Sequence, residues 1–289
     1  MDQRTTLPDG RQLGWRQWGD PGGRPLLRLQ GTPGSRLSIP PLHREWSDQN
    51  LRVIMTDRPG FGLSTRLPGR RVVDVADDYA FLLDDLQLDS VAVVGISGGG
   101  PHALAFAVRH PDRVLALTVV AGVPPLTDED VSLMPKANGI SQQLADLGWD
   151  ALHRFTEHER QLMLAEPVAG LRASMVNAPP DDQRIMSEPS WQQAHSTGVR
   201  EALRQGGEGW TDETMAILSP WGFEPEEVKP HVAWWAGDAD INCPIAAVRR
   251  YVDRLPHADL HVWEGAGHLR QYLRANQFLT DLTRRAFGD

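Results

Sequence analysis

The sequence predicts an α/β protein with a mostly parallel central sheet, helices on both faces of the sheet, and a helical insertion. Two patterns predict this class. Short apolar runs rich in β-branched residues alternate with helical periodicity through residues 25–121 and again through 232–287, which is typical of parallel strands joined by helices. Between these parts, residues 123–220 have helical spacing and no convincing strand. The 289-residue chain is long enough to bury a sizeable core.

The expected elements follow one another in a simple order. The expected strands are short and apolar, and they cover residues 11–18, 25–30, 51–56, 91–96, 114–121, 232–236 and 259–263. The expected helices outside the insertion cover residues 73–86, 101–110, 245–255 and 269–287. We therefore expect a core domain made of residues 1–122 and 221–289, with a helical cap at residues 123–220.

The composition narrows the class of partner. A net charge of −9 disfavours nucleic acid and anionic membrane surfaces. The N-terminal residues are polar, unlike a signal peptide. The longest apolar run, at 114–123, has about half of the ~20 residues that a membrane-spanning helix needs. The single cysteine, Cys243, excludes an internal disulfide framework and fits a reducing compartment. We expect a cytoplasmic protein that binds a small molecule, and a monomer and a dimer both remain open.

The insertion is rich in large, adaptable apolar side chains. Five of the seven methionines and four tryptophans fall within it or at its end. Such a stripe is typical of a helical core, but methionine also lines irregular apolar cavities. A helical insertion into an α/β sheet has to cover part of the sheet. We therefore interpret the insertion as a cap over a mainly apolar pocket.

A nucleophile elbow is predicted where the strand at residues 91–96 ends. Gly95, Ser97 and Gly99 fit the pattern G-x-S-x-G, and a helix rich in glycine and alanine follows. A strand that turns directly into a helix strains the backbone of the serine between them, and it brings the end of the strand close to the start of the helix. Only residues without a Cβ fit two positions before and after the serine. The spacing predicts that Ser97 is an exposed nucleophile at the carboxyl edge of the sheet.

A serine hydroxyl needs a base, and the base needs an orienting carboxylate. His268 lies in a glycine-rich turn after the last expected strand, and Asp240 follows the strand before it. Asp238 is the rival acid, and Asp240 is preferred. The order Ser97, Asp240, His268 is the order of the triad in α/β-hydrolases.

The motifs together resemble the α/β-hydrolase fold, in the capped family that includes small esterases, proline iminopeptidases, C–C bond hydrolases and haloperoxidase-like enzymes. The loop at residues 57–64, the acid loop at 237–244, the turn at 267–268 and the loop at 29–34 each match that pattern. The resemblance implies an oxyanion hole made by the backbone N–H groups of Thr32 and Gly98. Gln30 stands where the family usually has histidine, and we expect it to hold the oxyanion loop by a hydrogen bond.

The resemblance implies a serine hydrolase that cleaves a small carboxylic ester or lactone through an acyl-enzyme. No cofactor and no metal are expected. A C–C bond hydrolase, a peptidase or a lyase with the same triad remains an alternative, as does a slow ligand receptor. We expect a mainly apolar substrate, and a charged acyl group should be rejected because it would lose its hydration. The exceptions left open are basic residues that could point inward: Arg36, Arg154, Arg172 and Arg184.

Overall fold

The computed structural model describes residues 2–39 and 44–288. Its centre is one eight-stranded sheet with the order β1-β2-β4-β3-β5-β6-β7-β8. The strands are β1 (Gln3–Thr6), β2 (Gln12–Gly19), β3 (Arg24–Leu29), β4 (Leu51–Thr56), β5 (Val91–Ile96), β6 (Val114–Val120), β7 (Val232–Gly237) and β8 (Ala258–Trp263). The ladders β1–β2 and β2–β4 are antiparallel, and the ladders from β4 to β8 are parallel.

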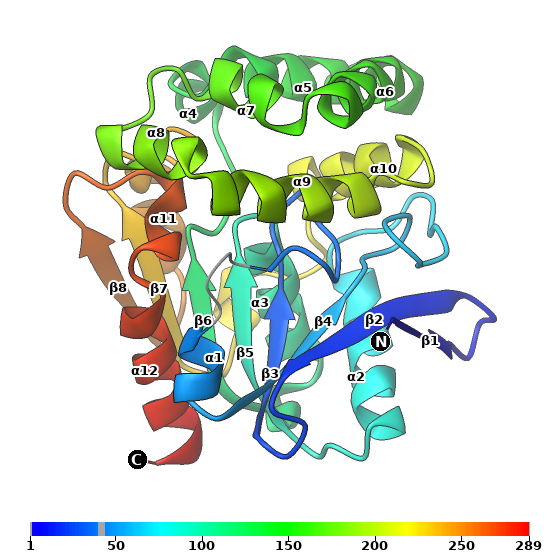
Figure 1. Ribbon diagram of the computed structural model, residues 1–289, viewed down its shortest axis with the longest axis vertical. Coiled ribbons are helices and arrows are strands. Elements are labelled where there is room, and N and C mark those ends of the chain that lie inside the picture. Colours follow the sequence, from blue (N-terminus) through cyan, green and yellow to red (C-terminus); the bar gives the residue numbers. More distant parts are fainter. Residues whose placement is uncertain (1, 40–43, 289) are drawn as a thin grey trace.

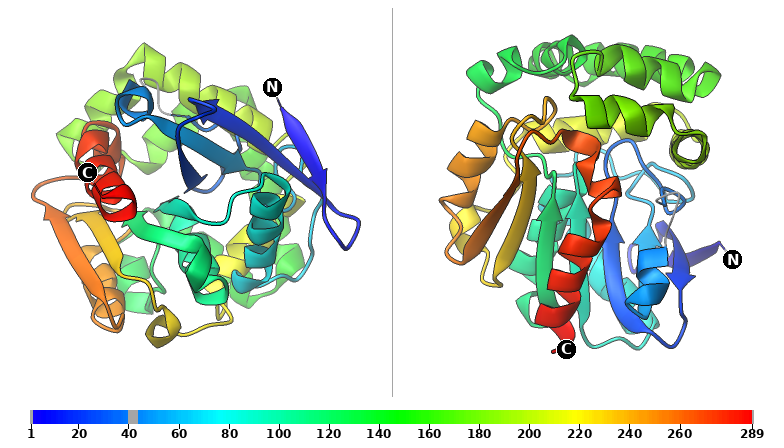
Figure 2. Two further views of the ribbon diagram at one scale, coloured as in Figure 1. Left: turned by 90° about the horizontal axis from the view of Figure 1, so that it is seen from below. Right: turned by 60° about the vertical axis from the view of Figure 1, so that its left-hand side comes forward.

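Helices cover both faces of this sheet (Figures 1 and 2). One face is covered by α2 (Ala76–Asp85), α3 (Gly99–Arg109) and α11 (Ile245–Val252), whose apolar residues form the larger core cluster with the sheet. The other face is covered by α1 (Arg44–Asp48) and α12 (Ala275–Phe287), which form a second cluster. The central strand β5 is buried at all six positions because helices cover it on both sides. The predicted fold class is confirmed.

The segment between β6 and β7 is helical and lies over the carboxyl edge of the sheet (Figures 1 and 2). Its helices are α4 (Asp128–Ser132), α5 (Lys136–Asp146), α6 (Trp149–Ala165), α7 (Pro167–Ser174), α8 (Pro180–Ser187), α9 (Pro189–Ala202) and α10 (Glu208–Leu218). This arrangement is what the helical spacing of residues 123–220 predicts. Among all the helices described, none combines the length and the apolarity that a bilayer span requires.

Some elements differ from the expectation. Strand β1 and the short helix α1 were not predicted, because four or five residues carry too little periodicity. The expected helix at 269–287 is divided into a 3-10 turn, η4 (His268–Tyr272), and α12. The division matters for the site because the turn carries the predicted base.

Candidate active site

The elbow at Ser97 has the geometry that its sequence predicts. Ser97 has a φ of 51°, in the left-handed region that strains any residue with a Cβ. Its N–H donates to the carbonyl of Val120 at 3.0 Å, which ties the turn to the end of β6. A Cβ on Gly95 would lie 2.6 Å from the Gly99 carbonyl oxygen, and one on Gly99 would lie 2.1 Å from the Leu29 carbonyl oxygen. The two glycines therefore allow the strand and the helix to meet at this angle.

Ser97, His268 and Asp240 form one hydrogen-bonded chain. The Ser97 Oγ lies 3.1 Å from His268 Nε2, and His268 Nδ1 lies 2.8 Å from Asp240 Oδ2. Burial opposes the charged imidazole, but the adjacent Asp240 carboxylate holds the pKa of His268 well above its ordinary value. Asp240 is buried and also accepts backbone N–H groups of Asn242 and Cys243. The rival Asp238 is exposed and accepts the N–H of Gly265 instead.

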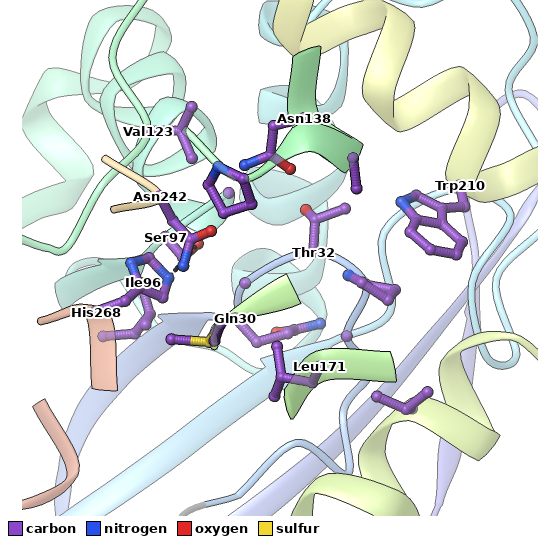
Figure 3. Close-up of a pocket in the computed structure, with 18 of the residues that line it drawn as sticks. Gln30, Thr32, Ile96, Ser97, Val123, Asn138, Leu171, Trp210, Asn242 and His268 are labelled. Carbon is purple, nitrogen blue, oxygen red and sulfur yellow. Dashed lines mark hydrogen bonds between the residues drawn. The ribbon is translucent and has the colours of Figure 1, made fainter. Parts of the chain in front are cut away.

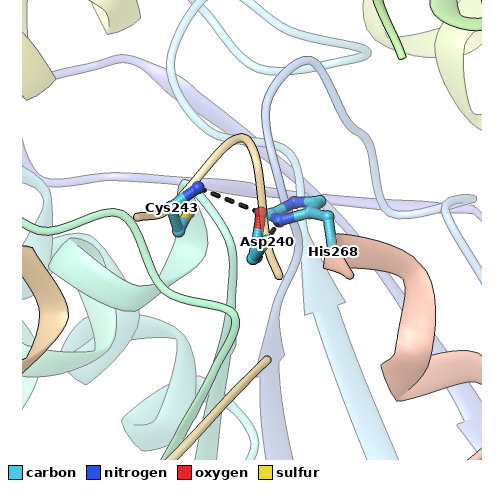
Figure 4. Close-up of side chains that lie close together, drawn as sticks. All are labelled: Asp240, Cys243 and His268. Atoms are coloured by element: carbon cyan, nitrogen blue, oxygen red, sulfur yellow. Dashed lines mark hydrogen bonds and ion pairs between the residues drawn. The ribbon is translucent and has the colours of Figure 1, made fainter. Parts of the chain in front are cut away.

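Cys243 lies beside Asp240 and His268 (Figure 4). The Cys243 sulfur, an Asp240 carboxylate oxygen and a His268 ring nitrogen all lie within 4.8 Å of one another. Burial raises the pKa of the Cys243 thiol to about 11, and the thiol donates to the carbonyl of Ala121 at 3.3 Å. A protonated thiol that already has an acceptor is a poor nucleophile, so Cys243 is a structural neighbour of Asp240.

The loop after β3 lies directly against the elbow. A Cβ on Gly98 would lie 3.3 Å from the backbone nitrogen of Thr32 and 2.3 Å from its Oγ1. Within the described part of the chain, neither the N–H of Thr32 nor that of Gly98 has a hydrogen-bond partner. Gly98 also precedes the first turn of α3, where the helix dipole favours negative charge. The two N–H groups are therefore available to stabilise an oxyanion near Ser97.

Gln30 anchors this loop, as expected. It is buried, and its Nε2 donates to the carbonyl of Thr56 at 2.6 Å. Arg58 secures the same loop from the other side, because its guanidinium donates to the carbonyls of Gln30 and Gly31 and to Thr32 Oγ1 at 2.5, 3.0 and 2.7 Å. The segment that carries the Thr32 N–H is thus fixed at several points.

Sequence reasoning missed a buried carboxylate behind the loop. Glu213, on α10, is fully buried and lies 2.7 Å from Arg58 Nε. It also pairs with Arg70, lies 3.2 Å from His102 Nε2 on α3, and accepts the Thr32 hydroxyl at 3.0 Å. Burial alone would raise its pKa, but the surrounding cations hold the pKa of Glu213 well below its ordinary value. This carboxylate joins the helical segment to the loop after β3 and to α3.

A second missed carboxylate, Asp182 on α8, lies against the turn that carries His268. Its Oδ1 accepts the N–H of Leu269 at 3.1 Å, and its side chain would meet a Cβ on Gly267 at 2.3 Å. Burial raises the pKa of Asp182 to about 6, although the charge of His268 opposes that shift. In the sequence Asp182 shares a helical face with Ile185 and Met186, and Glu213 follows Trp210 by three residues, but this spacing does not show which groups would surround a buried carboxylate.

A cavity of about 370 Å³ opens onto Ser97 and His268, which is a volume suited to a small ligand. Figure 3 shows the two residues at one side and Trp210 at the other. Most of its lining is apolar and comes from the helical segment: Val131, Met134, Phe155, Met163, Leu171, Met175, Trp191, Val199, Trp210, Ile217 and Leu218. The methionines and tryptophans of the segment therefore divide between this lining and the cores.

None of the four basic residues considered from sequence is among the described residues that line the cavity. Arg36 is buried and pairs with Asp57 at 2.7 Å. Arg172 donates to the carbonyl of Met186, Arg184 pairs with Asp181, and Arg154 is exposed.

Comparison with known proteins covers nearly the whole chain. A sequence profile of the family described as alpha/beta hydrolase fold matches residues 24–275. Over 269 residues the chain is 39% identical to the 2-hydroxymuconate semialdehyde hydrolase of Pseudomonas sp. (strain CF600), which covers 89% of this chain and 84% of the relative. It is 27% identical over 268 residues to the non-heme chloroperoxidase CPO-A1 of Kitasatospora aureofaciens. That alignment covers 91% of this chain and 90% of the relative.

A solved structure gives the same picture of the fold. The esterase of Exiguobacterium antarcticum superposes with a TM-score of 0.72 at 18% identity, over 98% of this chain and all of the other. The stretch matched by the family profile contains all three members of the hydrogen-bonded chain, from Ser97 to His268.

Proposed function

Because the chain belongs to the α/β-hydrolase fold family, we propose that this hydrolase cleaves a small carboxylic ester or lactone through Ser97, His268 and Asp240. The observation that carries the proposal is the hydrogen-bonded chain, with distances of 3.1 and 2.8 Å, that opens onto a mainly apolar cavity. The backbone N–H groups of Thr32 and Gly98 are proposed as the oxyanion hole. We propose residues 123–220 as a cap domain over a core of residues 1–122 and 221–289.

The first half of the proposed reaction forms an acyl-enzyme. Ser97 Oγ attacks the carbonyl carbon of the substrate while His268 Nε2 takes the hydroxyl proton. Negative charge develops on the carbonyl oxygen, and two preorganised N–H donors stabilise it without reorganisation. Asp240 keeps the imidazole in the orientation and tautomer that this step needs, and it stabilises the imidazolium.

His268 then gives its proton to the leaving alcohol oxygen as the C–O bond breaks, which completes the acyl-enzyme. In the second half a water molecule attacks the acyl-enzyme with the same imidazole as base, and the proton returns to Ser97 Oγ as the acid is released. The neutral imidazole is the base, and the Asp240 carboxylate holds the pKa of His268 high. The rate should therefore increase as the pH is raised.

A fluorophosphonate probe tests the proposal directly, because it reacts only with an activated serine. The protein should be labelled at Ser97, and Ser97→Ala should abolish both labelling and ester turnover. Ser141→Ala is a matched control, since Ser141 lines the same cavity but bonds to the carbonyl of Ala137. Labelling that persists in Ser97→Ala, or a folded protein that is not labelled, would exclude a working nucleophile at this position.

C–C bond hydrolysis with the same residues is a second candidate. The relative named 2-hydroxymuconate semialdehyde hydrolase, at 39% identity, favours it. A panel of activated esters, lactones and β-diketones distinguishes the two reactions. A β-diketone cleaved faster than every ester would favour the second candidate.

A further inference from the structure

Arg28 is a cation at the cavity wall that has no carboxylate partner among the residues the structure describes. Arg28, on β3, is 7% exposed and lines the cavity that contains Ser97. Its described hydrogen bonds use only Nη1, which donates to the Ser38 carbonyl at 3.1 Å and approaches the Met55 sulfur at 4.0 Å. A guanidinium has five N–H donors. Within the described residues, no Asp or Glu forms an ion pair with Arg28.

The other buried arginines of the described chain are neutralised. Arg36 pairs with Asp57 at 2.7 Å, and Arg58 and Arg70 both contact Glu213. A buried charge is costly unless it is paired. Burial lowers the pKa of Arg28, but arginine remains protonated in proteins. Arg28 therefore keeps an uncompensated positive charge at the wall of the cavity.

The cavity that Arg28 lines suits a ligand with an apolar chain that ends in a charged group. Tyr272 lines the same cavity as Arg28 and packs edge-on against Trp191 at 6.1 Å between ring centroids. Both aromatic residues line the cavity. The one carboxylate among the described lining residues is that of Glu159 on α6, which is half-buried and therefore partly hydrated. The poorly hydrated charge is thus the positive one.

We propose that Arg28 binds a carboxylate of the substrate while Ser97 attacks a carbonyl elsewhere in the same molecule. The substrate class is then a carboxylate-bearing ester or lactone, such as the half-ester of an aliphatic dicarboxylic acid. This inference rests on the proposed hydrolysis at Ser97. It reverses the expectation that a charged acyl group is rejected, because the structure provides a partner that the sequence pattern did not indicate.

The register of the sheet sets the spacing between the two backbones. Arg28 pairs with Val94 on β5, three residues before Ser97. Three residues of strand span roughly 10 Å. The apolar walls of the cavity suit a chain of methylenes between the carbonyl and the carboxylate, and a series of half-esters measures the length of that chain.

The test compares monomethyl half-esters of the dicarboxylic acids from succinic to suberic with neutral methyl esters of equal chain length. For wild-type protein, kcat/KM should favour the half-ester, with a maximum inside the series. Arg28→Met should lower that preference by on the order of 10- to 100-fold, because a charge-assisted hydrogen bond is lost. Arg28→Lys should retain part of it. Arg249→Met, on the exposed side of α11, is the matched control and should keep the wild-type preference.

Binding is measured separately from turnover. Monomethyl adipate is titrated into Ser97→Ala and into the Arg28→Met, Ser97→Ala double variant by calorimetry. Binding to the first and its loss in the second support the subsite even if Ser97 hydrolyses nothing. Neutral esters cleaved as fast as half-esters by wild-type protein would overturn the subsite and leave the proposed hydrolysis intact. If Arg28→Met and Arg28→Lys each lower kcat/KM equally for the half-ester and for the neutral ester, the subsite is overturned, because Arg28 then only holds the segment at Ser38.

Discussion

Removing the charge of Glu213 should destabilise the protein and loosen the oxyanion loop. Glu213→Gln keeps the side-chain shape but leaves the buried Arg58 and Arg70 without an anion. Breaking a buried ion pair by removing one partner costs about 3–5 kcal/mol. At about 2.1 cal/mol/K of unfolding entropy per residue, that cost lowers the Tm of a 289-residue protein by roughly 5–8 °C.

The same substitution should also affect the proposed catalysis. Glu213 accepts the Thr32 hydroxyl at 3.0 Å, so its loss should let the Thr32 N–H move. The loss of a whole oxyanion donor costs about 10²–10³ in kcat, so a displaced donor should lower kcat by a smaller factor. The change should appear in kcat rather than in KM, since the donor acts on charge that develops in the transition state.

Thermal unfolding and steady-state ester hydrolysis provide the assay. Glu226→Gln is the control, because it breaks an ion pair with Arg254 that is exposed, and surface ion pairs contribute little. If Glu213→Gln has the same Tm as the wild type, the reasoning that this carboxylate neutralises buried cations is refuted. A lower Tm with unchanged kcat would refute only its link to the oxyanion loop.

Three further predictions concern the acid, the histidine turn and the elbow. Asp240→Asn should lower kcat for ester hydrolysis by about 10⁴, as in a serine protease, whereas Asp238→Asn should change it little; reversed effects would reassign the acid. Asp182 has a pKa raised from 3.8 to about 6 in the fold, so the folded state binds the proton more tightly, and stability should fall by up to about 3 kcal/mol as the pH rises from 4 to 6. Asp182→Asn should lack this loss. The Tm of the variant relative to that of wild type should therefore be higher at pH 8 than at pH 4. A Tm difference that does not change with pH would contradict the argument. Gly99→Ala places a Cβ 2.1 Å from a backbone carbonyl of β3 and should cost about 2 kcal/mol or more in chemical denaturation. Gly170→Ala on α7 is the control for Gly99→Ala: its Cβ meets open space, so the substitution should stabilise the protein by about 0.5–1 kcal/mol.

The fold and the candidate triad could be predicted because their signals are local. The G-x-S-x-G spacing around Ser97 reports a backbone that cannot accept a Cβ at Gly95 or Gly99, whatever the rest of the chain does. Asp240 and His268 follow the ends of β7 and β8, and parallel strands bring their carboxyl ends to one edge. The order of the segments therefore places these side chains together before any tertiary contact is known.

Other features depend on packing between distant segments. Glu213 meets Arg70 across 143 residues of sequence, and Asp182 meets the turn at Leu269 across 87. Helical spacing puts Asp182 on the face of Ile185 and Met186, and Glu213 three residues after Trp210, but it does not show which distant segment contacts either carboxylate. They are buried only because the helical segment folds back over the sheet.

Arg28 shows the same limit most sharply. Alternation along β3 distinguishes one face of the strand from the other, but it does not say what covers either face. The tertiary structure places this side chain at Ser38, in a cavity that Tyr272 also lines, and among the described residues no carboxylate pairs with it. Sequence patterns record which backbone a segment adopts, whereas the charge that a side chain meets is decided by whichever distant segment packs against it.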